Sequence, residues 1–513
     1  MPSIIIREKD NTTSPTTEYS NFSVVIPGYY DDTKENVFDD NGIYECSSQK
    51  DFEDKIGIVE PTITSVAKYA DPEIINAEGT DFVSIYTKAL SAEEFYRTYY
   101  KIAYTYTELA GEVDAGKLKF KYTDSNEVDH YYSFTAPVEF VDGTNYVIIK
   151  AGNEGKDAED GDYCILGNQM AYELLGLGYT VLYKKIEEGG LDALKTEAYW
   201  ECLRDRSTYD FRYITLAGYN DIDAQRQIAA IAREKIEGDN TIIGRGDCTA
   251  LIDVDNSVFI DATSQKAAAK AIEDYVLGIV TADTNTAFFA PTVTYTLDND
   301  MAFELYGGNR EFPASFHYLA CAAAAKVNFA EWYAVAGYTR GSSNLYVESV
   351  GYKFGDTAAN ILAPREFKAT EEQKTFKCVN LITTERNNYY IWGNRTAKSL
   401  DDGEGLKAGH FLNVRQLCTT LKKRLYTLCK QFSFDPNSDL LWVNFCAAIR
   451  PTLDNMKTDQ GIFDYRLIKV EDRQRAKLTA YVRIVPIEAV EDFDITVYLE
   501  DNLNGGVSVS TIE

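Results

Sequence analysis

The residues that could carry chemistry in this chain of 513 residues are few and scattered. The three histidines, His130, His317 and His410, leave little for His-based catalysis or metal binding. His317 lies in an alanine-rich run, which favours a packed helical residue over a general base. The sequence therefore predicts no Ser-His-Asp catalytic site.

The nine cysteines are odd in number and widely spread, and none belongs to a CxxC pair. Several lie among apolar residues, as Cys321 does in YLACAAAA. This pattern favours buried free thiols in a reducing compartment over disulfides or zinc ligands.

Two further motif searches give weak results. GEGLKA (403–408) fits the loose glycine-rich dinucleotide pattern, but no strand-loop-helix unit surrounds it, so a turn is favoured. There is no GxxxxGK[ST] motif, and the acid-rich stretches lack the spacing of a calcium loop. We therefore predict no catalytic, cofactor-binding or metal-binding residues, and no cofactor.

The composition is that of a folded protein with a strongly acidic surface. The 51 Lys and Arg against 80 Asp and Glu give a net charge of −29, which argues against general nucleic-acid or anionic-membrane binding. The longest apolar run (318–325) is too short to span a bilayer, and the start lacks the features of a signal peptide. We expect synthesis and folding in a cytoplasm.

Charge is unevenly distributed along the chain. Residues 58–160 hold 19 acids and 9 bases, a net charge of −10, whereas residues 411–488 hold 13 bases and 8 acids, a net charge of +5. Different faces of the protein are therefore expected to meet different partners.

The elements that must position these residues follow from periodicity. FSVVIPG (22–28) predicts a buried strand, and Ser47 or Ser48 is expected to cap a helix that ends at Gly57. Residues 58–160 read as mostly β with one helix near 92–109, and from 161 helices and strands alternate, which indicates a sheet flanked by helices.

The C-terminal part has the clearest pattern. Asn413 is expected to cap a helix that runs to about residue 431, with apolar residues on one stripe. The bases Arg415, Lys422, Lys423 and Lys430 are expected on its outward side. An acidic protein partner is favoured over nucleic acid for this face, because the face belongs to a chain with a net charge of −29. A second helix, opening near Pro436, and three strands (464–470, 477–486, 492–500) are expected to follow.

Both ends of the chain have a strand-like tip on a polar or glycine-containing tether. The tips are Ile4, Ile5 and Ile6 at one end and Val507, Val509 and Ile512 at the other, with tethers at 8–20 and 501–506. Each tip is either a frayed terminus or a strand that pairs elsewhere.

The order of several motifs resembles that of the contractile tail sheath proteins of bacteriophages and related injection machines. The strongest stretch, 410–449, has an N-V-R start, a long helix, a Phe-x-Pro-Asn segment and a Leu-Trp pair. YIWGNRTA (390–397) is similar to the family's W-G-x-R-T element, and shorter segments at 46–57, 246–257 and 334–341 also resemble it. Between the segment 46–57 and the next family-like helix, 103 residues (58–160) intervene, which suggests an insertion.

The resemblance implies an α+β multidomain fold. Its parts are an N-terminal arm (1–20), a subtilisin-like but non-catalytic α/β core (21–57 and 161–400), an inserted mostly β outer domain (58–160), a C-terminal α+β domain (401–500) and a C-terminal arm (501–513). The arms of neighbours would complete the small C-terminal sheet, and the basic helix would face an inner tube.

The implied protein is a non-enzymatic structural subunit of a virion tail, assembled in the host cytoplasm. It would polymerise as stacked homohexameric rings around an inner tail tube protein and contract for genome ejection through the cell envelope. Baseplate and tail terminator or neck proteins are the other implied partners; nucleic acid and direct membrane insertion are not. The sheath of a non-viral bacterial injection particle and a subtilisin-like hydrolase remain as alternatives.

Overall fold

The structure is a computed structural model. It describes residues 22–28, 36–56, seven strands between 73 and 150 by their backbone alone, 158–186, 190–233, 244–296, 309–364, 376–385, 388–399, 406–470 and 478–489. The two tips predicted at 4–6 and 507–512, and the strand predicted at 492–500, lie outside these residues.

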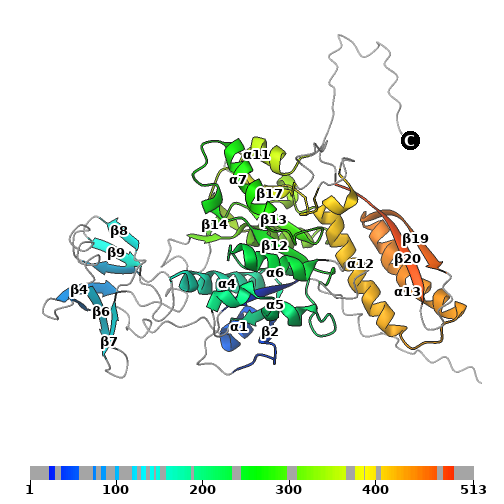
Figure 1. The fold of residues 1–513 in the computed structure, drawn as a ribbon, viewed down its shortest axis with the longest axis horizontal. Helices are drawn as coiled ribbons and strands as arrows, with labels where there is room; N and C mark the ends of the chain where they lie inside the picture. Colours follow the sequence, from blue (N-terminus) through cyan, green and yellow to red (C-terminus); the bar gives the residue numbers. More distant parts are fainter. Residues whose placement is uncertain are drawn as a thin grey trace, which may run out of the picture.

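An eight-stranded sheet forms the centre of the chain (Figure 1). Six parallel strands lie between two antiparallel edge strands, in the order β18-β17-β13-β12-β11-β1-β10-β2. The strands are β1 (Ser23–Gly28), β2 (Ile43–Cys46), β10 (Thr180–Lys185), β11 (Tyr213–Thr215), β12 (Thr249–Asp253), β13 (Thr286–Ala290), β17 (Val379–Glu385) and β18 (Asn388–Trp392). The buried strand predicted at 22–28 is confirmed as β1.

Helices cover both faces of this sheet, as the alternating pattern predicted. One apolar core includes residues of α1 (Gln49–Lys55), α4 (Ala158–Gly176) and α9 (Ala314–Lys326). The other includes residues of α6 (Ile222–Ala232), α7 (Gln265–Leu277) and α11 (Asp356–Leu362). Two short helices, α5 (Glu197–Trp200) and α10 (Gly337–Arg340), lie in the connections. The Ser48 side chain caps α1 by accepting a hydrogen bond from the backbone amide of Asp51, as expected.

A small antiparallel sheet adjoins the apolar core that contains α9. It has the order β15-β14-β16, made from β14 (Val293–Thr296), β15 (Asn309–Phe312) and β16 (Tyr346–Val350). Its inward residues Val293, Tyr295 and Phe312 belong to the same apolar core as α9.

The segment 58–160 contains a separate seven-stranded antiparallel sheet in the order β7-β6-β3-β4-β5-β9-β8 (Figure 1). Its strands are β3 (Glu73–Asn76), β4 (Phe82–Thr87), β5 (Tyr99–Ile102), β6 (Leu118–Thr123), β7 (Asp129–Ser133), β8 (Glu139–Gly143) and β9 (Tyr146–Lys150). The mostly β prediction is confirmed. The helix predicted near 92–109 is wrong over 99–102, where β-branched and aromatic side chains form β5 instead.

The C-terminal unit consists of two long helices and a hairpin: α12 (Leu412–Gln431), α13 (Asp439–Thr458), β19 (Ile462–Val470) and β20 (Thr479–Pro486). The apolar stripe of α12 packs on α13, as predicted, through residues such as Leu417 and Leu421. The predicted cap of α12 is wrong, because Asn413 lies inside the helix and binds Asn394. The second helix begins near Pro436 as expected, at Asp439, and Ser438 caps it.

Within the sheet, β1 lies between β10 and β11, so the chain winds outward in two directions from its first strand. This order is that of a doubly wound α/β sheet. The α/β prediction for the core is confirmed at that level; likeness to subtilisin stays an expectation.

Candidate assembly surface

The polar side of α12 is buried against the eight-stranded sheet, so this helix is covered on two sides. Figure 1 shows α12 between that sheet and the α13 layer. Gln416, Thr419, Thr420 and Lys423 are all buried, on the side away from the leucine stripe. A helix in this position connects the core domain to the C-terminal unit.

Arg212, which directly precedes β11, is the centre of this connection. Its Nε donates to Gln416 Oε1 at 2.8 Å, and its Nη2 donates to the Gln416 carbonyl at 3.0 Å. Its Nη1 donates to Glu331 Oε2 at 2.8 Å and to Thr420 Oγ1 at 3.0 Å. The guanidinium is fully buried, and the planar fork suits several acceptors at once. Gln416 extends the network by donating to Thr249 Oγ1 on β12.

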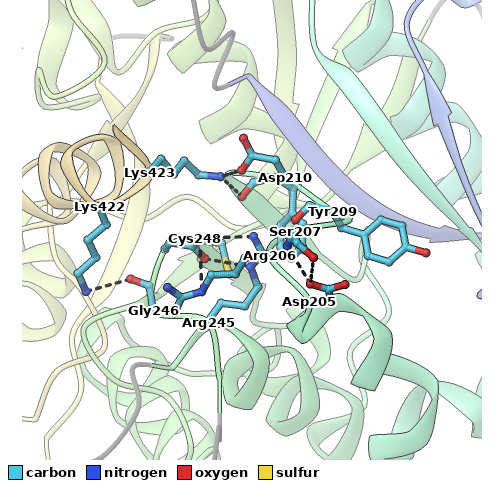
Figure 2. A network of polar contacts seen from close by, with 12 residues as sticks. Asp205, Arg206, Ser207, Tyr209, Asp210, Arg245, Gly246, Cys248, Lys422 and Lys423 are labelled. Carbon is cyan, nitrogen blue, oxygen red and sulfur yellow. Dashed lines mark hydrogen bonds and ion pairs between the residues drawn. The ribbon is translucent and has the colours of Figure 1, made fainter. Parts of the chain in front are cut away.

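The prediction that the four basic residues of α12 point outward is wrong for Lys423 and incomplete for two others. Lys423 is buried, and its Nζ donates to the Asp210 carboxylate and to the Phe211 carbonyl (Figure 2). Burial lowers the Lys423 pKa, and the negative charges of Asp210 and Asp247 partly offset that effect.

The partly exposed residues also bind the core domain. Lys422 donates to the Gly246 carbonyl at 3.0 Å, and Arg415 donates to Asn285 Oδ1 at 2.9 Å. Lys430 is exposed at the far end of the helix, beside the ring of Tyr426. Contact of these residues with a tube stays a prediction. Their hydrogen bonds to the core domain reduce the basic surface that α12 could present to a partner.

A second buried arginine organises the loops that α12 contacts. Arg245, labelled in Figure 2, stacks on Phe211 and forms an ion pair with Asp247 at 2.9 Å. Its Nη1 donates to the carbonyls of Leu203 and Tyr209. The cationic neighbours hold the pKa of the Asp247 carboxyl below its usual value despite burial. These contacts connect the loops on which α12 packs.

The W-G-x-R-T and N-V-R motifs meet at the start of α12. Asn394 Nδ2 donates to Asn413 Oδ1 at 2.8 Å, and the Asn413 amide donates back to Asn394 Oδ1 at 3.0 Å. Thr396 Oγ1 donates to the Gly409 carbonyl, and Arg395 lies over the Phe411 ring. Residues that the sequence offered as separate motifs thus form one buried joint between the two units.

At the carboxyl edge of the sheet, where doubly wound folds commonly bind ligands, two pairs of side chains bind each other. The carboxylate of Asp253, at the end of β12, accepts a hydrogen bond from the Ser315 amide at 2.6 Å and another from the Ser315 hydroxyl at 2.7 Å. Burial raises the Asp253 pKa to about 7, although the bonds from Ser315 oppose that rise. Near the end of β1, Tyr183 donates to Asn168.

The histidine prediction is confirmed for His317, which is buried in α9. Its ring contacts the Tyr295 hydroxyl and the Cys321 thiol, and burial lowers its pKa to about 4. His410 is also buried and binds backbone groups of Lys407 and Ser399. The side chain of His130 lies outside the described residues.

The cysteines that the structure describes are free thiols, and five of them are buried. Cys429 is exposed, contrary to the expectation for the set. Within the described ranges, no group of three or more His, Cys, Asp or Glu side chains is arranged to hold a metal ion. In that part of the chain, no helix is long and apolar enough to cross a membrane.

Exposed apolar side chains concentrate on the C-terminal unit. Seven of the twelve large exposed hydrophobic residues found among the described residues lie between 434 and 487. These are Phe434, Leu440, Val443, Phe463, Tyr481, Val485 and Ile487. Among the described strands, β19 and β20 pair only with each other, so each leaves one edge unpaired. The unit therefore presents exposed apolar side chains and two strand edges.

Comparisons with known proteins gave matches only among solved structures. No protein-family model and no curated protein matches the chain. A structure of the anti-feeding prophage baseplate is 12% identical with a TM-score of 0.49, covering 98% of this chain and 99% of that chain. The contracted sheath complex of PVC, an extracellular contractile injection system, is 15% identical with a TM-score of 0.43, covering 63% and 77%.

A sheath tail protein from Desulfitobacterium hafniense is 10% identical with a TM-score of 0.41, covering 94% of this chain and 100% of that chain. These matches come from contractile sheath and injection assemblies, the class that the motif order resembles. With TM-scores under 0.5, they establish neither the fold nor the function of this chain.

Proposed function

We propose that this chain is the structural subunit of a contractile sheath, which polymerises around an inner tube and acts without catalysis. The observation that carries the proposal is the β19–β20 hairpin. A two-stranded sheet is marginal alone in water. This one leaves both edges unpaired among the described strands and exposes the apolar side chains of Phe463, Tyr481 and Val485. Strands added from neighbouring copies would complete it.

The strand-like tips at 4–6 and 507–512 suit this role, because polar or glycine-containing stretches of sequence (8–20 and 501–506) separate each of them from the rest of the chain. A strand added to an unpaired edge forms several backbone hydrogen bonds, each worth about 1 kcal/mol net. A head-to-tail contact that does not close generates a helical polymer. The same proposal includes assembly into hexameric rings, contraction, and contact with tube and baseplate proteins. It also includes location in a virion and an outer position of residues 58–160 in the sheath.

The buried joint around Arg212 supports the mechanical part of this function. A subunit that transmits force needs its sheet-adding unit fixed to its core, and a fully buried arginine with four hydrogen bonds provides that fixation. This joint would serve the sheath of a phage and the sheath of a non-viral injection particle equally well, so it does not distinguish between them. In a hydrolase, by contrast, Asp253 and Ser315 would need a histidine, and His317 contacts Tyr295 and Cys321 instead.

Truncation of the arms tests the proposal. Variants lacking 1–8 or 505–513 are expected to remain folded and soluble but to form no tubes in negative-stain micrographs, whereas the full chain forms striated tubes. Circular dichroism and size-exclusion chromatography check that each truncated subunit is folded. Normal tubes from both truncations would refute strand addition by the arms, and peptidase activity of purified tubes that is lost on Ser315→Ala would favour the hydrolase.

A further inference from the structure

The C-terminal unit carries two exposed patches that complement each other in charge. The hairpin patch lies on the outer face of β19–β20 and consists of Phe463, Arg466, Tyr481, Arg483, Val485 and Ile487. Asp464, opposite Val485, is also exposed on this face, and its carboxylate forms an ion pair with Lys457 of α13 at 3.2 Å. The turn patch lies at the α12–α13 connection and on the first turns of α13, and consists of Phe434, Asp435, Leu440 and Val443.

In the hairpin patch, Arg466 and Arg483 lie directly opposite each other in the strand register, and both are exposed. Like charges at such a pair destabilise a hairpin. Among the described residues, no hydrogen bond or ion pair offsets them. Phe463, Tyr481 and Val485, each more than half exposed, share this region with the arginines. The patch therefore suits a partner with an apolar anchor and a carboxylate.

The turn patch has these two features. Phe434 is fully exposed and has a φ of 73°, a backbone conformation that costs a bulky residue about 1 kcal/mol or more. Strain of this kind concentrates at functional positions. Asp435 follows directly, is exposed, and has no side-chain partner among the described residues.

The two patches do not meet within one copy. The inner face of the hairpin, with Tyr465, Leu467, Val482 and Ile484, packs against the core that α12 and α13 share. The hairpin patch is therefore on the far side of the hairpin from α13, whereas the turn patch belongs to α13 and its approach. A contact between them requires two molecules.

We propose that the turn patch of one copy docks on the hairpin patch of a second copy. Phe434 packs between Tyr481 and Val485, and Asp435 lies against Arg466 and Arg483. The two surfaces differ, so the contact is head-to-tail and can propagate. The inference rests on the proposed polymerisation and adds a face-to-face contact that is distinct from strand addition at the hairpin edges.

Mixed disulfide crosslinking of full-length chains tests the contact. Phe434→Cys and Val485→Cys are made separately, each with Cys429→Ser to remove the exposed native thiol. Under mild oxidation during assembly, the mixture is expected to give a linked dimer, while each variant alone gives none. Val280→Cys, at an exposed residue of the core domain, is the matched control and should not link to Phe434→Cys.

Charge reversal gives an independent readout. Asp435→Arg is expected to raise the critical concentration for assembly at least about tenfold, because three bases then meet. Asp261→Arg, at another exposed aspartate, should leave that concentration unchanged.

Each further outcome overturns the inference in a recognisable way. Tubes that form from the mixture without the crosslink refute this contact but leave the polymer proposal intact. Slow maleimide labelling of Val485→Cys in the monomer would mean that the chain's own terminal segment covers the hairpin patch. Protection that develops only when a tube protein is added would assign the patch to that partner. If the unmodified chain never polymerises, the proposed function itself fails.

Discussion

Replacing Arg212 by methionine tests the joint between the core domain and α12. The change removes all four hydrogen bonds of the guanidinium and leaves the Glu331 carboxylate, whose side chain is only 17% exposed, with the Thr420 hydroxyl as its remaining partner. Breaking a buried ion pair from one side costs about 3–5 kcal/mol, and the partial exposure of Glu331 favours the lower end. We expect a loss of about 3 kcal/mol in the free energy of unfolding.

The assay is urea unfolding of the unassembled subunit, combined with hydrogen exchange across 412–431. Exchange along α12 should accelerate more than exchange in β12, since the joint loosens before the sheet does. The matched control is Lys270→Met, because the Lys270 side chain is 59% exposed and forms ion pairs with Glu273 and Asp274 on its own helix. That variant is expected to lose about 0–0.5 kcal/mol.

A compensating variant makes the physical reason testable. Arg212→Met combined with Glu331→Gln removes the lone carboxylate, so it should recover about 1–2 kcal/mol of the loss. The reasoning is refuted if Arg212→Met costs no more than Lys270→Met. It is also refuted if the double variant is no more stable than the single one.

Three other substitutions follow from the same geometry. Lys423→Met should lower the free energy of unfolding in urea by only about 1 kcal/mol, because the Asp210 side chain is 47% exposed and can be hydrated again. Lys423→Glu puts a third carboxylate beside Asp210 and Asp247, so it should lower that free energy by about 3 kcal/mol or more. Asp253→Asn should flatten the pH dependence of stability. The folded pKa of Asp253 is raised from 3.8 to about 7, so the folded state binds more protons than the unfolded state between about pH 4 and 7. Stability attributable to this group therefore falls as the pH rises through that window, by up to about 4 kcal/mol. Replacing 57–157 by a Gly-Ser linker of about ten residues should leave a folded, tube-forming subunit, because α1 contacts α4 near Tyr172, roughly 21 Å along the helix from Ala158.

Distinct observations would contradict each of these expectations. Equal losses for Lys423→Met and Lys423→Glu would mean that charge is not what matters at that position. A pH profile of stability unchanged by Asp253→Asn would remove Asp253 as its cause. A linker variant that folds, as judged by circular dichroism, but forms no tubes would place the inserted segment in subunit contacts.

Much of the local structure was predictable because it depends on neighbours in sequence. Ser48 caps α1 since a serine followed by an apolar helical pattern can satisfy the free amide of Asp51 wherever that helix lies. The strand 23–28 and the apolar stripe of α12 follow from hydrophobic periodicity in the same way. The error over 99–102 arose where aromatic and β-branched residues fit either period, so that only pairing with β4 and β9 decided the outcome.

The charged side of α12 shows where the sequence stops being sufficient. By itself the sequence determined that this helix has an apolar stripe and a basic side, because side chains repeat every 3.6 residues. It did not determine what packs against the basic side. Only the tertiary structure brings Arg212, Asp210 and the Gly246 carbonyl, which are distant in sequence, to that face. A charge is exposed or buried according to the groups that surround it in space. Two acceptors on the loop before β11, the Asp210 carboxylate and the Phe211 carbonyl, make burial of Lys423 possible here.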